Sequence, residues 1–408
     1  MIDYVIKNAR LANHIEIVNI GFEHGRIAAI GSNIDCDAPT HDAEGCLCCG
    51  GLIETHIHLD KSRIMDRCAP EADRSSPAFQ RVQPVKKDFT VEDVYERAKK
   101  TLERCLKQGT TRMRTHVEVD PDVGMRGYEG VQALVDEYKW AIDIELCVFP
   151  QVGLISRPGT DELMVDGLKR GAQVIGASPA NDTDCAGQIH RVFELAHEYG
   201  VDIDMHLDFG NSAEQLDITL VCDLTEQYKL GGRVAVGHAT KLSTLPPARQ
   251  REIARRLGDV GVAVTILPAT DLFLMGRNQD YDVRRGVVDA HLFVSEGCNC
   301  SISSNNILNP FTPFGDCSLI RMANLHANVL QISHTQKITE SFNMITTRSA
   351  RLMNLVDYGI RVGNPADVVI IDAESPAQAV AEIREPLAVF KAGRHTMTRS
   401  RAVLHHAP

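Results

Sequence analysis

Two histidines in one apolar run are the first side chains in this sequence whose types and spacing could do chemistry. His56 and His58 alternate with Ile57 and Leu59. Because alternate residues of a strand point to the same face, both imidazoles can converge on one point. Neutral imidazole is a common ligand for zinc or iron, and a third histidine from another strand would leave positions open for water. His206, in a second strand-like run, is the candidate for that third ligand.

Other residues with ionisable or amide side chains close further apolar runs. In parallel barrels the active site forms at the carboxyl ends of the strands, so residues that recur at such ends are expected to share one site. The candidates are Asp60, Lys61, His116, Glu118, Asp120, Gln151, Asp208, His238, Asp271, Asn305 and Asn306.

Eight strand-like runs that would carry these residues recur through the middle of the chain, with helical apolar spacing between them. Eight strands with intervening helices are typical of an α/β fold of the (β/α)8 TIM barrel type. A doubly wound open sheet would need a Gly-x-Gly-x-x-Gly loop after its first strand, and that loop is missing. The runs are 52–59, 111–119, 142–149, 173–177, 201–207, 233–236, 262–267 and 299–303, and the helical segments include 91–107, 187–199, 214–229 and 248–257.

Short alternating runs also occupy both ends of the chain. They cover 4–6, 15–20 and 26–30 near the start, and 367–372 and 387–391 near the end. We expect these runs to assemble into one small β-sandwich domain, formed by 1–50 plus 358–408. The metal-dependent hydrolase barrel would then span 51–357.

Composition excludes several classes of protein and partner. The 408 residues are 44% hydrophobic and 24% charged, as in ordinary globular proteins, and the net charge of −11 argues against binding nucleic acid. The first residues lack a secretory signal, and no apolar run is long enough to span a membrane, so a cytoplasmic protein without a membrane partner is expected. In that compartment the twelve cysteines should be thiols. Cys46 and Cys49 have a C-x-x-C spacing without a second pair, so a structural role is expected for them. A homo-oligomer stays open, because no self-complementary patch can be recognised in the sequence.

Several motifs resemble the amidohydrolase superfamily, and within it the cytosine deaminases and the N-isopropylammelide amidohydrolases. The matching segments include 51–61 (GLIETHIHLDK), 114–120 (RTHVEVD), 148–153 (VFPQVG), 204–206 (DMH) and 310–315 (PFTPFG). The resemblance implies that His56, His58 and His206 bind one divalent metal ion, zinc as the first expectation and iron or manganese as alternatives. It also implies that His238 orients or deprotonates the attacking water, and that Gln151 binds a ring carbonyl or amide.

Two positions depart from the pattern of that family. Asn305 stands where the family has an aspartate that is a weak metal ligand and a proton acceptor, and Phe209 stands where cytosine deaminases have a proton-shuttling glutamate. An amide offers an oxygen to a metal, so Asn305 is predicted as a fourth metal ligand, but it accepts no proton. The loss of one acid–base group typically costs roughly 10²–10⁴ in rate. His238 and Asp208 are the predicted catalytic substitutes, with Glu118 as a third candidate.

The predicted function is hydrolysis of a carbon–nitrogen bond of a small N-heterocycle, by deamination or dealkylamination of an aminopyrimidine or aminotriazine. The predicted substrate-binding residues are Gln151, Lys61, Glu118, Phe209 and Asn306. Phe209 would make its side of the site apolar, which favours an alkyl or aromatic substituent. Two alternatives remain at this point: hydrolysis of an amide, carbamate or cyclic amide, and a catalytically degenerate binding protein, which Asn305 and Phe209 would explain.

Overall fold

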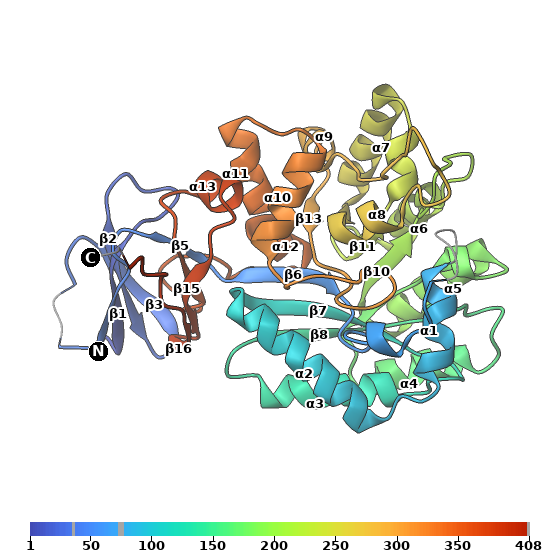
Figure 1. Ribbon diagram of the computed structural model, residues 1–408, viewed down its shortest axis with the longest axis horizontal. Helices are drawn as coiled ribbons and strands as arrows, with labels where there is room; N and C mark the ends of the chain where they lie inside the picture. Colours follow the sequence, from blue (N-terminus) through green and yellow to red (C-terminus); the bar gives the residue numbers. More distant parts are fainter. Residues whose placement is uncertain (35–36, 72–76, 406–408) are drawn as a thin grey trace.

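Eight parallel strands form a barrel at the centre of the protein. The computed structural model describes residues 1–34, 37–71 and 77–405. The strands follow one another around the barrel in sequence order, which confirms the predicted fold class (Figure 1). Their bounds are β6 (Leu52–Ile57), β7 (Thr110–Glu118), β8 (Asp143–Phe149), β9 (Val174–Ile175), β10 (Asp202–Leu207), β11 (Val234–His238), β12 (Val262–Ile266) and β13 (Cys300–Ile302).

The first and last strands of the barrel meet beside His56 of β6 and His58, which directly follows this strand. The backbone N–H of His58 donates to the carbonyl oxygen of Asn305 over 2.9 Å, and the N–H of Asn305 donates to the carbonyl oxygen of His56 over 3.0 Å. Ile57 and Asn305 form a parallel bridge at this point. The candidate metal ligands therefore lie at the seam that closes the barrel.

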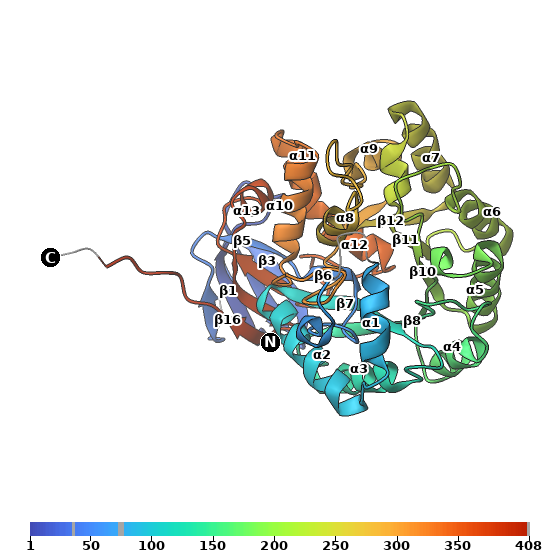
Figure 2. The ribbon, with the colours of Figure 1, turned by 45° about the vertical axis from the view of Figure 1, so that its right-hand side comes forward.

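Helices surround the barrel and cover its apolar outer surface (Figure 2). In α2 (Val91–Lys107), the buried side chains of Val94, Ala98, Leu102 and Cys105 are spaced three or four residues apart, so they form one stripe against the strands. The other helices are α1 (Ala78–Lys86), α3 (Arg126–Glu137), α4 (Thr160–Lys169), α5 (Cys185–Tyr199), α6 (Ile218–Tyr228), α7 (Pro247–Val260), α8 (Pro268–Leu274), α9 (Ala290–Ser295), α10 (Leu319–Val329), α11 (Thr335–Asn343), α12 (Thr347–Leu352) and α13 (Pro376–Ala381).

Two four-stranded sheets pack together beside the barrel and contain strands from both ends of the chain (Figure 1). Ile6, Ile20 and Phe22 from the N-terminal part share a buried core with Ile370 and Phe390 from the C-terminal part. This arrangement confirms the predicted β-sandwich, whereas the domain boundaries at 50 and 358 stay a prediction. The first sheet holds β1 (Tyr4–Ala9), β2 (Val18–Glu23), β3 (Arg26–Gly31) and β4 (Thr40–Asp42), and the second holds β5 (Leu47–Gly50), β14 (Val368–Ile371), β15 (Pro386–Lys391) and β16 (Arg394–Thr398).

The cysteines near residue 48 belong to the sandwich. Cys48 and Cys49 lie in β5, which pairs with β14, and burial raises the pKa of the Cys49 thiol to about 12. The cysteines among the described residues are all free.

Within the described residues, no helix has the length and apolar character that crossing a membrane requires.

An ion-pair cluster centred on a buried lysine connects the sandwich to the barrel. The ammonium of Lys391, at the end of β15, lies 2.6 Å from a carboxylate oxygen of Asp143 at the start of β8 and 2.6 Å from one of Asp367. Close by, the hydroxyl of Tyr358 donates to the carbonyl oxygen of Gly51 over 2.9 Å. Gly51 connects β5 to β6, and a Cβ there would overlap the side chain of Thr111.

Replacement of Lys391 by Met should destabilise the protein, because it leaves Asp367 buried without its ammonium partner. We expect the free energy of unfolding to fall by about 3 kcal/mol, as for other broken buried ion pairs. Chemical denaturation followed by circular dichroism measures the change. The matched control is Lys139→Met at an exposed position, and equal stability of the two variants would contradict the expectation.

Candidate functional site

Three imidazoles converge at the carboxyl ends of the barrel strands. The Nε2 atom of His206 lies 3.2 Å from Nε2 of His56 and 3.0 Å from Nε2 of His58. His56 and His58 are buried, and His206, in β10, is partly exposed. The structure therefore brings together the three histidines that the sequence predicts as metal ligands.

The surroundings of His56 and His206 fix the orientation of their rings. Nδ1 of His56 lies 3.3 Å from a carboxylate oxygen of Asp204, which directs Nε2 toward the other two histidines. The ring of Phe149 stacks on that of His206, with centroids 4.9 Å apart. Gly237 leaves room for His56, because a Cβ at this position would lie 3.0 Å from the Cε1 atom of the imidazole.

The geometry and charge state of this trio fit a bound divalent cation. Nitrogen ligands at about 2.0–2.1 Å from a tetrahedral zinc lie roughly 3.3 Å from one another, close to the spacing found here. Burial lowers the pKa of His56 to about 3 and holds the pKa values of His58 and His206 well below their ordinary range, so the rings stay neutral. Among the described residues, the buried Oδ1 of Asn305 has no hydrogen-bond partner, which leaves it available as a further oxygen ligand.

A second set of ligand atoms lies directly behind the first. His56, His116 and Asp204 also bring one atom each within 4.8 Å of the others. Asp204 is already engaged, because a guanidinium nitrogen of Arg114 lies 3.1 Å from its Oδ2. We therefore assign this set the role of holding His56 in place.

His238 lies beside the trio, with Nδ1 held by a carboxylate and Nε2 directed into the site. Its Nδ1 atom is 2.5 Å from Oδ1 of Asp271 in α8, so Nδ1 carries the hydrogen and the lone pair of Nε2 faces the site. The amide nitrogen of Asn305 lies 3.4 Å from Nε2. His238 and Asn305 have φ angles of 70° and 64°, a strained conformation that is common at functional sites.

A cavity of about 470 Å³, the active-site cavity, opens over these groups. Polar donors and acceptors face it from several strand ends, and apolar side chains form much of the remaining wall. His58, Gln151, His206, Phe209, His238 and Asn306 line it together with Phe79, Ser178, Asn181, Asn211, Thr270, Leu274, Arg277 and Phe311, among others. Its size suits a one- or two-ring heterocycle.

A buried lysine fixes the amide of Gln151 in one orientation. The ammonium of Lys61, which can only donate, lies 2.7 Å from Oε1 of Gln151. Glu118 lies 3.7 Å behind Lys61 and also pairs with Lys86 of α1 over 2.6 Å. Burial lowers the pKa of Lys61, and the nearby carboxylate of Glu118 opposes this shift. Gln151 therefore directs its NH₂ group toward Ser178 and the cavity.

The amide of Asn306 is fixed in the same way. The backbone N–H groups of Phe311 and Thr312 donate to Oδ1 of Asn309, and the Nδ2 atom of Asn309 then donates to Oδ1 of Asn306 over 2.7 Å. This sequence of bonds leaves the NH₂ of Asn306 as the group that faces the cavity.

Two residues that the sequence places in the site have other contacts. Both oxygens of Asp208 accept backbone N–H groups at the start of α6, from Asp217 and Ile218 at 3.0 Å each, so this carboxylate supports a helix and does not line the cavity. The tight turn after β10, with Asp208 at φ 48°, takes its side chain off the face that His206 shares. Glu118 contacts the two lysines and does not line the cavity either.

Asp271 and Asp204 have roles that the sequence did not reveal. Asp204 precedes His206 by two residues, so strand alternation alone could have placed both on one face. The contact between Asp271 and His238 joins two different strand ends, and no local pattern indicates it.

Comparison with known proteins places this site in a family. A model described as the amidohydrolase family matches residues 88–399. The chain is 27% identical to the N-isopropylammelide isopropyl amidohydrolase of Pseudomonas sp. (strain ADP), over 96% of each chain. Its structure is similar to that of 5-methylcytosine deaminase from Klebsiella pneumoniae with 5-fluorocytosine, with a TM-score of 0.93 and 26% identity over 98% of this chain and 99% of that one. It is also similar to N-isopropylammelide isopropylaminohydrolase from Burkholderia multivorans, with a TM-score of 0.86 and 25% identity over 97% and 98% of the two chains.

Loss of one imidazole from the trio should weaken cation binding. We expect His58→Asn to bind zinc at least about tenfold more weakly than the unchanged protein, because an uncharged nitrogen ligand is removed while the buried surroundings stay in place. Competition with a fluorescent chelator and elemental analysis measure the affinity and the bound metal. The control is His190→Asn at an exposed position, and equal zinc affinity in both variants would exclude His58 as a ligand.

Proposed function

The chain belongs to the amidohydrolase family, and from this membership we propose that it hydrolyses the exocyclic carbon–nitrogen bond of a small N-heterocycle, an aminopyrimidine or an aminotriazine. The relatives named above act on heterocycles of these kinds. The single observation that carries the proposal is that His238, directed by Asp271, faces the same cavity as the converging imidazoles.

In this proposal His56, His58 and His206 hold one divalent cation, with zinc as the first expectation and iron or manganese as alternatives. When bound, such a cation lowers the pKa of water and so supplies a nucleophile near neutral pH. Asn305 offers an amide oxygen to the same place, and it adds no negative charge there.

The two fixed amides indicate which edge of the substrate they bind. Gln151 and Asn306 both present NH₂ groups, so they complement ring carbonyl oxygens or unprotonated ring nitrogens. A heterocycle with two acceptors along its edges meets both amides at once. This hydrogen bonding would hold the reacting carbon in place relative to His238.

His238 performs the proton transfers. Its Nε2 atom takes a proton from the attacking water as the water oxygen bonds to the ring carbon, and Asp271 stabilises the resulting imidazolium through Nδ1. The same Nε2 then gives the proton to the exocyclic nitrogen as the carbon–nitrogen bond breaks. Ammonia or an amine leaves, and the oxygen stays on the ring.

Phe209 favours an amine over ammonia as the leaving group. Its ring lies edge-on to that of His238, with centroids 5.2 Å apart, and it lines the cavity near the group that protonates the leaving nitrogen. Apolar surface at this place gains free energy by contact with an alkyl substituent. We therefore propose alkylamino heterocycles as the preferred substrates.

Replacement of His238 by Asn should remove most of the activity, because no other group in the proposed pathway accepts the proton of water. We expect kcat to fall by about 10²–10⁴ while zinc content and thermal stability are retained. Turnover is measured with N-isopropylammelide, unsubstituted aminotriazines and aminopyrimidines, and products are identified by mass spectrometry. His190→Asn serves again as the control. Tight binding without turnover in the unchanged protein would contradict the proposal, and ring-opened products would favour a cyclic-amide hydrolase.

Replacement of Phe209 by Glu should reverse the preference between leaving groups. A carboxylate beside an alkyl substituent loses the apolar contact, so we expect kcat/KM for N-isopropylammelide to fall by about 10–200-fold relative to the same ring with an unsubstituted amino group. Phe209→Leu keeps an apolar side chain and is the matched control. An unchanged ratio in Phe209→Glu would show that this wall does not contact the leaving group.

A further inference from the structure

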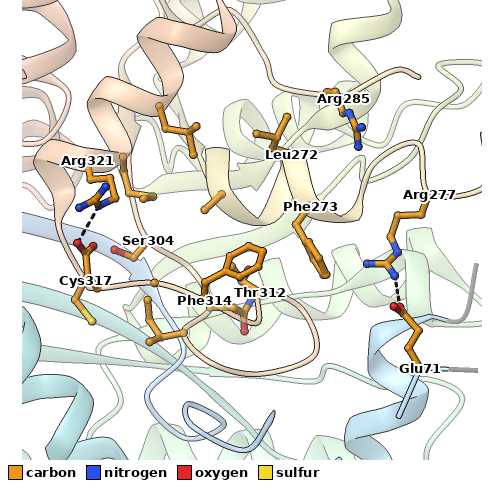
Figure 3. A pocket seen from close by; sticks show the side chains of 17 residues that line it. Glu71, Leu272, Phe273, Arg277, Arg285, Ser304, Thr312, Phe314, Cys317 and Arg321 are labelled. Carbon is orange, nitrogen blue, oxygen red and sulfur yellow. Dashed lines mark hydrogen bonds and ion pairs between the residues drawn. The ribbon is translucent and has the colours of Figure 1, made fainter. Parts of the chain in front are cut away.

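A second cavity, which we call the annex, lies beside the active-site cavity and has no part in the mechanism above. Its volume is about 730 Å³, and it lies against α8, α10 and the loop that follows β13 (Figure 3). The lining residues that matter below are Phe273, Arg277, Arg285, Asn306, Thr312 and Phe314.

The wall between the two cavities consists of side chains. Arg277 and Asn306 line both cavities. Thr270, which lines the active-site cavity, shares a 2.7 Å hydrogen bond with Thr312, which lines the annex. The guanidinium of Arg277 lies over the ring of Phe273 at 4.6 Å and pairs with Glu71. Because the wall consists of side chains, rotation of these side chains can alter the separation between the two cavities while the barrel strands stay in place.

The lining of the annex combines an apolar surface with one uncompensated positive charge. Phe273 and Phe314 meet edge to face at 5.6 Å, and Phe314 is 58% exposed although it is aromatic. Arg321 pairs with Asp316 over 2.9 Å, at the end of the annex away from Arg277 and Arg285. Among the residues that the structure describes, no carboxylate pairs with Arg285.

We propose that the annex binds the distal part of the substrate, an apolar linker that ends in a carboxylate, while the heterocycle occupies the active-site cavity. The inference rests on the proposed function and deepens it. Phe273 and Phe314 provide the surface for the linker. Arg285 pairs with the terminal carboxylate, because a guanidinium binds carboxylate through two parallel hydrogen bonds. The shared residues Asn306 and Arg277 mark where the linker passes from one cavity to the other.

Direct binding tests the annex without any turnover. The probes are 4-phenylbutyrate and its neutral amide, titrated into the intact metal-loaded protein by calorimetry. We expect the carboxylate to bind about tenfold more tightly than the amide, and Arg285→Gln to abolish this difference. Arg284→Gln is the matched control, because Arg284 is exposed like Arg285 but lines neither cavity. Phe314→Ala, a change at an exposed side chain, should weaken both probes alike.

Linked compounds test whether the annex serves the same substrate. An aminopyrimidine that carries a carboxyalkyl chain should bind more tightly than either separate piece, because the second contact becomes intramolecular. Equal affinity for the carboxylate and amide probes, or equal losses in Arg284→Gln and Arg285→Gln, would overturn the anionic site. A linked compound no better than its pieces would overturn the assignment to substrate. Failure of turnover on every heterocycle, with probe binding intact, would count against the proposed function and leave the annex standing.

Discussion

The site depends on one constraint, the convergence of three neutral imidazoles in a buried barrel mouth, where Nε2 of His206 lies 3.2 Å from that of His56 and 3.0 Å from that of His58. Neutral imidazoles have one donor each, so three Nε2 atoms that face a common point cannot all be satisfied by one another. Protonation does not relieve the conflict, because burial disfavours the charged form. A cation that accepts all three lone pairs resolves it, and the rest of the site must hold the rings in place for that cation.

That support comes from two layers of the structure. The backbone hydrogen bonds between the ends of β6 and the segment after β13 fix His56 and His58 against Asn305 at the closing seam. Behind them, carboxylates and basic side chains alternate, so that Arg114 neutralises Asp204 while Asp204 orients His56. A similar set of buried charges, Lys61 with Glu118, orients Gln151. Because each buried charge has a partner, the polar groups keep one orientation at a tolerable desolvation cost.

Strand periodicity made most of the fold and the ligand trio predictable from the sequence. The eight central runs coincide with β6 to β13, and His56 and His58 follow from alternation within a single strand. Three strands of the sandwich escaped prediction. The strands β4 and β5 are only three and four residues long, and β5 pairs with the distant β14. The strand β16 pairs with the preceding β15, but its sequence RHTMT is largely polar. Asp208 shows where periodicity fails: a positive φ directly after the strand redirects its side chain to α6, and nothing in the sequence signals that turn. The pairing of His238 with Asp271 depends on how two strand ends meet, which only the closed barrel determines.

Asn305 and Phe209 leave the site without a carboxylate at two positions where the family resemblance predicts one. Asn305 offers an amide oxygen and no negative charge to the proposed cation, and under the proposed function His238 is the acceptor for the proton of the attacking water. In that scheme Asp271 does more than orient His238, because its carboxylate also compensates the positive charge of the imidazolium. Asp271 does not belong to the predicted set of metal ligands. Phe209, edge-on to that imidazole, keeps the neighbouring space apolar. Under the proposed function ammonia and an amine each take one proton from His238, so proton transfer does not separate them, and the apolar surface of Phe209 is what favours the alkylamine.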